Sequence, residues 1–412
     1  MLTEQVRYLL SPAAIRQRAG VLLRRARAAQ SKHFVIDDKR LPAVADYVLK
    51  VIEESYPSLE IPVHSRWRHF DVGGVRRTAL LETELLGSAK DRARAKIDLA
   101  VTSVLLDAGA GMAWQFIEPD GAPVFRRSEG LAVASFHLFR QGAFSSDPAA
   151  PLQADAQGLQ VFSQATLEVG FQVAPNNPLL GVKGRSELMR ALGHATILHP
   201  DLFGRNKPRP GGLVDAIWER ARVVEGGKRI VDATMILECV LVGFGSIFPD
   251  RLSWDGVPLG DVWQHSALGE AGSFESLVPI HKLSQWLTYS LIEPLTEAGL
   301  TIVGTEQLTG LAEYRNGGLF VDLGLLVAKD PTLAERIVLP SEELVVEWRA
   351  LTVALLDEVG ETVRHKLGRS ETDLPLAKIL EGGTWAAGRK IASAKRADGG
   401  PPFRIASDGT VF

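Results

Sequence analysis

Apolar side chains recur at helical spacing along almost the whole of this chain, and this pattern restricts the fold more than any other feature. Residues 282–298 are the clearest case, because Leu283, Trp286 and Leu287 begin a run of apolar positions three and four apart that ends at Gly299. The same periodicity predicts further helices over residues 12–29, 41–55, 91–107, 129–141, 155–169, 184–194, 211–223, 230–243, 342–358 and 384–395.

Strand signals are few and short, at Val124–Phe125, Thr301–Val303 and Phe403–Ile405. Strands do not alternate with helices along the chain, which argues against a doubly wound sheet. We therefore predict a mainly α protein, with a single large helical domain over residues 1–412 and few short strands. The stretch 199–212, rich in Pro and Gly, is the place at which the chain could divide into two packed halves.

The composition suits a folded protein with a large core. Hydrophobic residues make up 46% of the chain, yet no apolar run approaches the roughly 20 residues of a membrane-spanning helix. Cys239 is the single cysteine, which excludes an internal disulfide and favours a reducing cytosol. The Arg-rich start could be a mitochondrial leader, but Ser11 as a cap and Pro12 at the first helical position indicate an ordinary helix. We expect a cytoplasmic protein with no membrane partner.

The net charge of −3 is unevenly distributed. Residues 1–30 carry +5 and residues 389–412 carry +3, so the rest of the chain carries −11. A slightly acidic chain of this kind is not expected to bind nucleic acid. Cationic residues that gather in a few motifs suit a small anionic ligand better.

Common cofactor and nucleophile motifs are absent from the sequence. It holds no HExxH, no His/Cys pair at zinc spacing, no GxxxxGK[ST] and no GxSxG, and the glycines at 109 and 111 lack the third glycine of a dinucleotide site. We therefore expect no cofactor and no metal held by His or Cys. A metal held through carboxylates alone stays open.

Asp107 stands at the end of an otherwise apolar helical run and is followed by Ala-Gly-Ala-Gly and then Trp114. The small residues allow a ligand or another backbone to approach closely. A carboxylate at such a place is a candidate general acid or base. The alternative is that Asp107 caps the next segment.

The segment HSRWRHF (64–70) places Arg66 and His69 beside Trp67. Guanidinium groups at this density can bind a phosphate or a carboxylate through paired hydrogen bonds. A solvated loop anchored by Trp67 would explain the same residues without any ligand.

Three further polar residues are weaker candidates. The segment RSEG (127–130) is typical of the start of a helix, with Ser128 as its cap and Glu129 in its first turn. Gln172 and Asn177 lie in a Pro-rich loop, where amides could recognise a ureido or ribose group or could simply form a turn.

The segment LTGLAEYRNGGLFVDLG (308–324) contains more candidate catalytic and binding side chains than any other segment. Glu313, Tyr314 and Arg315 precede a Gly-Gly pair, and Asp322 follows inside an apolar run. An acid, a phenol and a guanidinium group together are costly to bury unless they are used, which favours a site.

His281 and Lys282 open the long predicted helix 282–298. At this position they could act as a pair of cationic donors for an anion.

Seven segments together resemble the uracil catabolism protein family of fungi and bacteria, long regarded as a domain of unknown function. They are HSRWRHF, DLAVTSVLLDAGAG, RSEGLAVAS, HKLSQWLTYSLIEPL, LTGLAEYRNGGLFVDLG, EWRALTVALLD and GGTWAAGR. The resemblance runs from about residue 10 to the terminal DGTVF, so it covers nearly the whole chain.

The order of several motifs is also similar to that in the queuosine salvage proteins, helical N-glycosidases that resemble DNA glycosylases. That similarity implies a glycosylase-like helical core and matches Asp107 with Trp114, Lys282, and Glu313-Tyr314-Arg315 to elements of the salvage enzymes. It fails where an acidic residue is expected, because this chain has Phe171-Gln172 there. Asp107, Glu313 or Asp322 would have to supply the catalytic carboxylate.

The resemblance implies an N-glycosidase that cuts the ribose–urea bond of a ribosylurea, or its 5-phosphate, with an anionic nucleotide-like substrate. Arg66, Lys282 and Arg315 are then candidates for the phosphate, and Trp114 and Tyr314 for the sugar or the leaving group. A non-catalytic protein that binds a pathway nucleotide or associates with other enzymes of uracil degradation is the alternative. Nucleic-acid binding is a third hypothesis, against which the charge of −11 in the middle of the chain argues.

Overall fold

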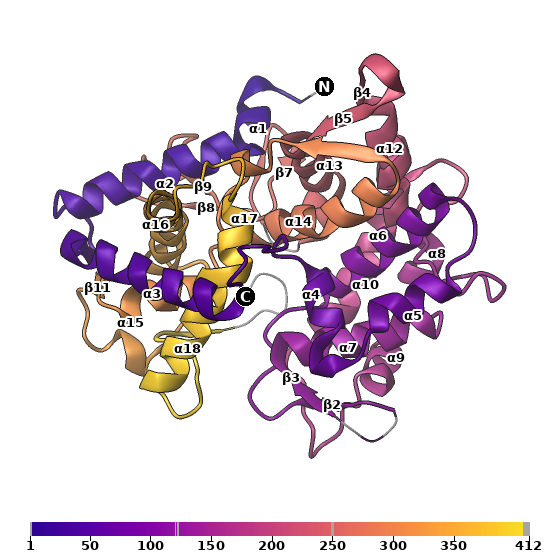
Figure 1. Ribbon diagram of the computed structural model, residues 1–412, viewed down its shortest axis with the longest axis horizontal. Coiled ribbons are helices and arrows are strands. Elements are labelled where there is room, and N and C mark those ends of the chain that lie inside the picture. The colour runs from indigo at the N-terminus through magenta and orange to yellow at the C-terminus, as the bar shows by residue number, and fades with distance from the viewer. Residues whose placement is uncertain (1, 120, 122, 249–250, 407–412) are drawn as a thin grey trace. The chain divides into compact units, whose positions relative to one another are not determined.

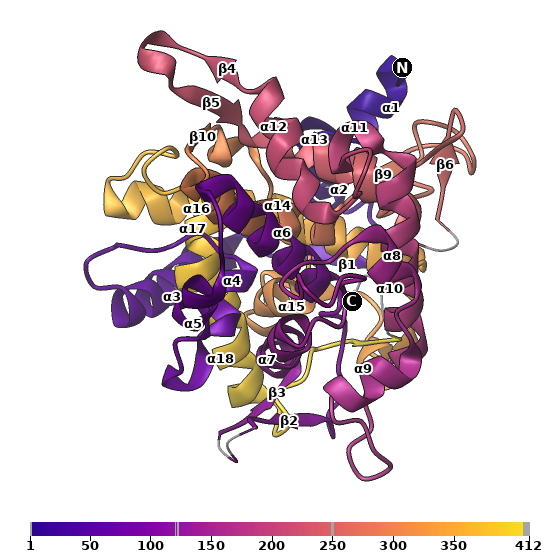
Figure 2. The same ribbon diagram turned by 90° about the vertical axis from the view of Figure 1, so that its right-hand side faces the viewer.

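The computed structural model describes residues 2–119, 121, 123–248 and 251–406. Helices dominate this part of the chain, as Figure 1 and Figure 2 show, and its strands are only two to four residues long. The prediction of a mainly α protein with few short strands is confirmed. The segment DGTVF, which contributes to the family resemblance, lies outside the described residues.

The α-helices run over Glu4–Leu9 (α1), Pro12–Arg27 (α2), Leu41–Ser55 (α3), Arg66–Phe70 (α4), Arg77–Glu84 (α5), Ala89–Leu105 (α6), Arg127–Arg140 (α7), Ala156–Gln160 (α8), Gln164–Gly170 (α9), Val182–Leu198 (α10), Pro200–Phe203 (α11), Leu213–Arg220 (α12), Ala233–Phe244 (α13), Lys282–Glu297 (α14), Tyr314–Asp322 (α15), Glu343–Leu367 (α16), Leu376–Ile379 (α17) and Trp385–Lys395 (α18). A single π-helical turn, Leu380–Thr384, joins α17 to α18.

The strands run over Phe34–Ile36 (β1), Gln115–Ile117 (β2), Val124–Arg126 (β3), Arg222–Val223 (β4), Arg229–Asp232 (β5), Ser253–Trp254 (β6), Val257–Pro258 (β7), Val262–Gln264 (β8), Leu277–Pro279 (β9), Leu300–Val303 (β10), Leu326–Ala328 (β11), Ile337–Val338 (β12) and Arg404–Ile405 (β13). They form one three-stranded sheet in the order β10-β5-β4 and the two-stranded pairs β1-β11, β2-β3, β6-β7, β8-β9 and β12-β13.

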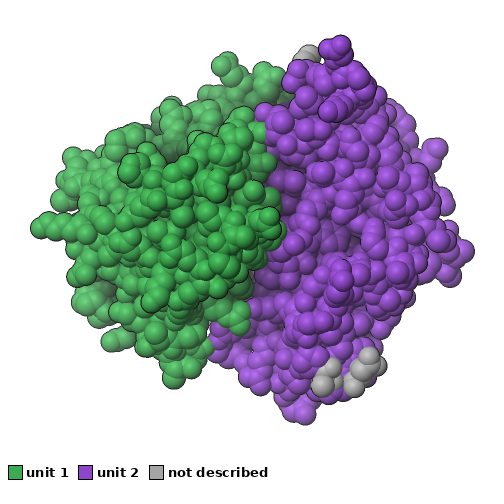
Figure 3. All heavy atoms as spheres, viewed as in Figure 1, with its two compact units in different colours: residues 1–64, 251–285, 304–406 green, residues 65–250, 286–303, 407–412 purple. Residues whose placement is uncertain are grey.

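The chain separates into two compact units, coloured green and purple in Figure 3. Unit 1 comprises residues 1–64, 251–285 and 304–406, and unit 2 comprises residues 65–250, 286–303 and 407–412. The stretch 199–212 lies inside unit 2, so the boundaries between the units fall elsewhere. A single domain over residues 1–412 stays a prediction.

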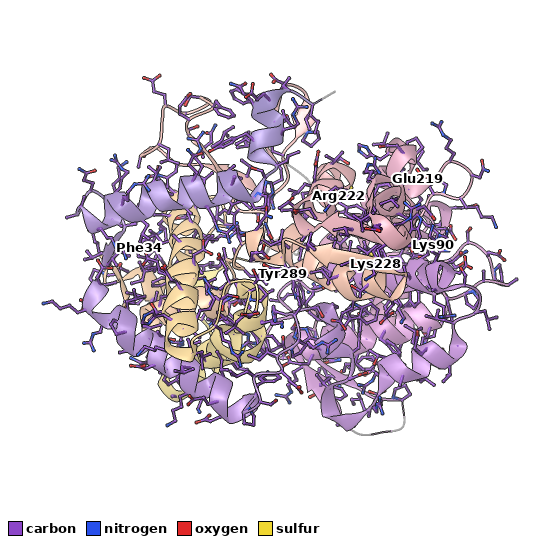
Figure 4. The ribbon with its side chains drawn as sticks, turned by 45° about the horizontal axis from the view of Figure 1, so that its top comes forward. Phe34, Lys90, Glu219, Arg222, Lys228 and Tyr289 are labelled. Atoms are coloured by element: carbon purple, nitrogen blue, oxygen red, sulfur yellow. The ribbon has the colours of Figure 1, made fainter. Side chains whose placement is uncertain are left out.

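Unit 1 is built around the long helix α16. Ser11 accepts a hydrogen bond from the amide of Ala14 at 3.2 Å and so caps α2, as the sequence predicts, and α2 packs its apolar stripe against α16. Phe34 on β1, labelled in Figure 4, is fully buried. Helices α15 and α18 pack closely because Gly388 has no side chain, and a Cβ there would overlap the carbonyl oxygen of Arg315.

Unit 2 is built around α6, which is buried from Ala95 to its end at Leu105. Helices α4, α7, α10 and α12 pack against it. Asp98, fully buried on α6, accepts hydrogen bonds from the amides of Ala154 (2.9 Å) and Gly211 (2.6 Å) and pairs with Arg209. The stretch 199–212 is therefore fastened to the core of unit 2. Tyr289, on the part of α14 that belongs to this unit, is also fully buried (Figure 4).

Several boundaries differ from the sequence prediction for local reasons. The helix predicted over 155–169 divides into α8 and α9, because Asp155 and Ser163 each cap a separate helix. The first residues of the helix predicted over 230–243 instead form β5, which pairs with β10, and α13 starts only after the cap residue Asp232. The helix predicted over 342–358 continues to Leu367.

The predicted strands at 124–125, 301–303 and 403–405 are confirmed in β3, β10 and β13, with bounds that differ by one residue. Short helices such as α4, α5 and α15 were not predicted, since five to nine residues carry too little periodicity.

Candidate functional site

Asp107 follows the end of α6 and lies in a hydrogen-bonded cluster of unit 2. Its Oδ2 accepts a hydrogen bond of 2.6 Å from the hydroxyl of Ser128, and its Oδ1 lies 3.2 Å from Nη1 of Arg66. The side chain of Asp107 is 9% exposed, whereas that of Arg66 is not exposed at all. The side chain of Asp107 is thus only slightly exposed, and its Oδ1 is buried and accepts no hydrogen bond from a described residue.

Arg66, on α4, is held on several sides. Its Nε donates to Ser103 Oγ at 2.7 Å, and its Nη1 donates to the carbonyl oxygen of Ser128 at 3.2 Å. The guanidinium carbon lies 5.5 Å from the ring centroid of Trp286. Burial lowers the pKa of Arg66, and the charge of Asp107 opposes that effect.

The segment around Arg66 is a buried helix rather than the solvated loop that the sequence also allowed. Trp67 donates its indole N–H to the carbonyl of Ser290 at 2.7 Å, and the amide of Arg66 donates to Ser290 Oγ at 2.9 Å. His69, 6% exposed, places Nδ1 3.4 Å from both Arg66 Nη1 and Ser128 Oγ.

Helix α7 brings Ser128 and Glu129 to this cluster. Its first residue, Arg127, has a φ of 54°, which is unusual outside glycine and marks local backbone strain next to Ser128. Glu129 is half-buried, and its charge acts on Arg66 in the same direction as that of Asp107. We call Arg66, His69, Asp107, Ser128 and Glu129 the Asp107 cluster.

Arg185, on α10, is a residue that the sequence analysis missed. It is fully buried, and its guanidinium donates to the carbonyl oxygens of Leu106 (3.0 Å), Ala108 (2.7 Å) and Leu180. It therefore fixes the backbone on both sides of Asp107. Burial lowers the pKa of Arg185 to about 10, and the charge of Asp107 partly offsets this.

A sequence signal for Arg185 did exist. Arg185, Leu188, Met189 and Leu192 are spaced as one face of a helix, and the last three are buried core residues. An arginine on the apolar face of a predicted helix must find acceptors inside the protein.

Trp114, Gln172 and Asn177 lie in unit 2 but have other partners. Trp114 is fully buried and donates its indole N–H to the carbonyl of Phe171 at 2.9 Å. The amide group of Gln172 bonds both backbone groups of Ile117, and that of Asn177 bonds both backbone groups of Gln115. These amides extend strand β2, so their hydrogen-bonding capacity is already in use. Ligand contacts for these three residues stay predictions.

Glu313 and Asp322 lie at opposite ends of α15 in unit 1. Glu313 is the N-cap, and its carboxylate accepts from the amides of Arg315 (2.8 Å) and Asn316 (2.7 Å). Asp322 forms a two-pronged ion pair with Arg396, at 2.7 and 2.6 Å. Both carboxylates therefore serve contacts that stabilise the fold, and a catalytic role for either stays a prediction.

His281 and Lys282 stand at the start of α14. His281 is fully buried, its Nε2 lies 2.9 Å from the carbonyl oxygen of Leu9, and burial lowers its pKa. A neutral imidazole fits these surroundings better than the cation expected from the sequence, because the charged form would lose its hydration. Lys282 is half-buried, so it keeps access to solvent.

Asp261, a second residue that sequence reasoning missed, organises this helix start. It pairs with Arg349 at 2.8 and 2.7 Å, and its Oδ2 accepts from the amide of Lys282 at 3.0 Å. Arg349 lowers the pKa of Asp261, which keeps negative charge at the N-terminal end of α14.

Arg315, in the first turn of α15, is 4% exposed. Its guanidinium carbon lies 5.2 Å from the ring centroid of Tyr314 and 5.1 Å from that of Trp385. Nη1 and Nη2 are buried and have no hydrogen-bond partner among the described residues.

The structure thus distributes the expected site residues over two places. Unit 2 brings together Arg66, His69, Asp107 and Glu129, and unit 1 holds Glu313, Tyr314 and Arg315 on one turn of α15. Within the described ranges, no group of three His, Cys, Asp or Glu side chains is arranged to hold a metal ion. None of the described helices is long and apolar enough to cross a membrane.

Comparisons with known proteins match nearly the whole chain. A family model described as "Protein of unknown function (DUF1688)" matches residues 8–412. Uracil catabolism protein 4 of Lachancea kluyveri is 39% identical, with 93% of each chain covered. Protein urg3 of Schizosaccharomyces pombe is also 39% identical, with 100% of each chain covered.

Proposed function

This chain belongs to the DUF1688 family, and from that premise we propose that it acts in uracil catabolism by hydrolysing the ribose–urea bond of a ribosylurea or its 5-phosphate. The pathway is suggested by the name of the relative from Lachancea kluyveri, and the reaction by the Asp107 cluster. Water adds at C1′ of the ribose while the C1′–N bond breaks. The bonding electron pair and a proton go to the urea nitrogen, which gives urea and ribose or ribose 5-phosphate.

The observation that supports this reaction is the placement of Asp107. Glu313 is committed to a helix cap and Asp322 to Arg396, whereas Asp107 lies in one cluster with the other polar residues Arg66, His69, Ser128 and Glu129. Cleavage of an N-glycosidic bond passes through an oxocarbenium-like sugar. A carboxylate beside C1′ can stabilise that positive charge and accept a proton from the attacking water.

The remaining members of the cluster have separate roles in this proposal. Ser128 and Arg66 fix the two oxygens of the Asp107 carboxylate, so that its orientation is set before substrate binds. Glu129, half-buried beside them, is the candidate for binding the urea group or for supplying its proton. Arg185 acts through the backbone around Asp107 and is a positioning residue.

The direct test is to incubate the purified protein with ribosylurea and with its 5-phosphate and to measure urea. We expect urea from one or both substrates, and we expect Asp107→Asn to lose this activity while Asp322→Asn keeps most of it. Calorimetric binding of either compound without urea release would instead support a non-catalytic binding protein. Activity of Asp107→Asn, Glu313→Gln and Asp322→Asn alike would reject the assignment.

A further inference from the structure

Arg315 is a buried cation for which unit 1 supplies no acceptor. The side chain is 96% buried, since 4% of it is exposed, and neither Nη1 nor Nη2 donates a hydrogen bond to a described residue. No ion pair within the described ranges includes it. An arginine side chain is always charged in proteins, so the cost of burying it without an acceptor is not removed by loss of a proton.

Two carboxylates on the segments around Arg315 have other partners. Glu313 accepts from the amides of Arg315 and Asn316 with its two oxygens. Glu381, in the π-helical turn before Trp385, lies 2.7 Å from Nδ1 of His64. The rings of Tyr314 and Trp385 attract the guanidinium, but a ring face cannot accept its N–H groups as an oxygen would.

Two further donors on elements that pack against α15 are also buried without a hydrogen-bond acceptor. The indole N–H of Trp348 on α16 and the hydroxyl of Thr384 in the π-helical turn are buried without a hydrogen-bond partner. Both of these elements pack against α15. Buried donors of this kind are rare in native proteins, and each needs an explanation. The two unsatisfied Nη groups of one buried guanidinium are the complement of an oxyanion, whereas Asn316 Oδ1 in the same turn of α15 is a buried acceptor without a partner among the described residues.

We propose that Arg315 is the main cationic group of an oxyanion site in unit 1, and that its ligand is the phosphate of a sugar phosphate. The planar guanidinium can donate two parallel hydrogen bonds to phosphate oxygens, which Lys282 cannot do. Arg66 is a poorer choice, because Asp107 already neutralises it. The identity of the sugar rests on the proposed function, whereas the oxyanion site rests on Arg315 alone.

The test measures phosphate binding by the full chain and needs no turnover. Calorimetry and thermal unfolding are carried out with inorganic phosphate, ribose 5-phosphate, ribose and acetate. For the wild-type protein we expect binding of both phosphates, and no binding of ribose or acetate. Arg315→Gln should weaken phosphate binding about 10- to 100-fold, the loss expected for a charged hydrogen-bonding group.

Arg389→Gln is the matched control. Arg389 also lies over the ring of Trp385, at 5.8 Å, but its side chain is exposed. This variant removes one positive charge from the same neighbourhood and should bind phosphate as the wild type does. Equal loss in both variants would mean that general positive charge, rather than Arg315, attracts the anion, and would overturn the proposal.

A second measurement separates ligand binding from a structural role. Without phosphate, Arg315→Gln should unfold at the same temperature as the wild type or at a higher one, because it removes a buried charge without an anionic partner. A lower unfolding temperature would contradict the proposal, and so would wild-type protein that binds no phosphate or binds acetate equally well. Urea release does not enter these outcomes, so the site and the proposed reaction can fail independently.

Discussion

Two buried arginines, Arg66 in unit 2 and Arg315 in unit 1, show how differently the same side chain can be used. Both lie against aromatic rings, at 5.5 Å from Trp286 and 5.1 Å from Trp385. Arg66 has a carboxylate at 3.2 Å and hydroxyl and carbonyl acceptors around it. The two Nη groups of Arg315 have no acceptor among the described residues.

This difference separates a guanidinium group whose charge is paired within the protein from one whose charge has no carboxylate partner among the described residues, although Nη2 of Arg66 also lacks a hydrogen-bond partner there. Burying a guanidinium group costs free energy unless its charge and its N–H groups are matched. Arg66 forms an ion pair with Asp107 and donates hydrogen bonds to Ser103 and Ser128. Its replacement should therefore lower the free energy of unfolding. Arg315 should matter for binding rather than for folding. The following predictions test this comparison, from the largest expected effect to the smallest.

Asp107→Asn should reduce urea release about 10²- to 10⁴-fold, the usual contribution of a positioned acid–base or charge-stabilising group. Asparagine keeps the size of the side chain and can still accept from Ser128, so the fold should survive. The measurement is the rate of urea formation, with circular dichroism as the check on folding. Asp322→Asn is the control, because the carboxylate of Asp322 is paired with Arg396. This variant should keep the wild-type rate within a few-fold.

Arg66→Met should lower the free energy of unfolding by about 3 kcal/mol, because it leaves the buried charge of Asp107 without its cation and removes the hydrogen bond to Ser103. Guanidinium denaturation measures this change and avoids urea, the expected product. The double variant Arg66→Met, Asp107→Leu should recover part of the loss, since no unpaired charge remains. A single variant as stable as the wild type would show that the pair does not support the fold.

Arg185→Lys should lower the free energy of unfolding by about 2 kcal/mol, since an ammonium group cannot reach several carbonyls around Asp107 at once. Because Asp107 would be less well oriented, we also expect kcat to fall about tenfold with little change in KM. Arg190→Lys is the control on the same helix, where the side chain makes one bond to the carbonyl of Phe162. Equal effects in the two variants would argue against a positioning role.

The neutral His281 should make the protein less stable as the pH falls below about 6.5. Its pKa is lowered in the folded state, so the unfolded chain binds the proton more readily and stability falls as the pH decreases. One such group changes the free energy of unfolding by at most about 1.4 kcal/mol per pH unit. Denaturation curves at pH 7 and pH 5 should differ less for His281→Asn than for the wild type.

Much of the fold could be predicted from local sequence. Helices α2, α3 and α14 begin and end within two residues of their predicted bounds, because apolar spacing and caps such as Ser11 act within a few residues. The sequence also marked Asp107, Arg66 and Glu129 separately, and the structure brings them into one cluster. The short helix α4, which carries Arg66, gave no periodic signal of its own.

The sequence by itself determined the mainly helical class, the main helices and a set of chemically suitable residues. Only the tertiary structure decided which carboxylate is committed to what: Glu313 to a cap, Asp322 to Arg396, and Asp107 to Arg66. It also revealed Arg185 around the Asp107 backbone and Asp261 with Arg349, 88 positions apart. The physical reason is range: helix spacing and caps depend on neighbours along the chain, whereas the pairing of buried charges depends on distant segments that meet only on folding.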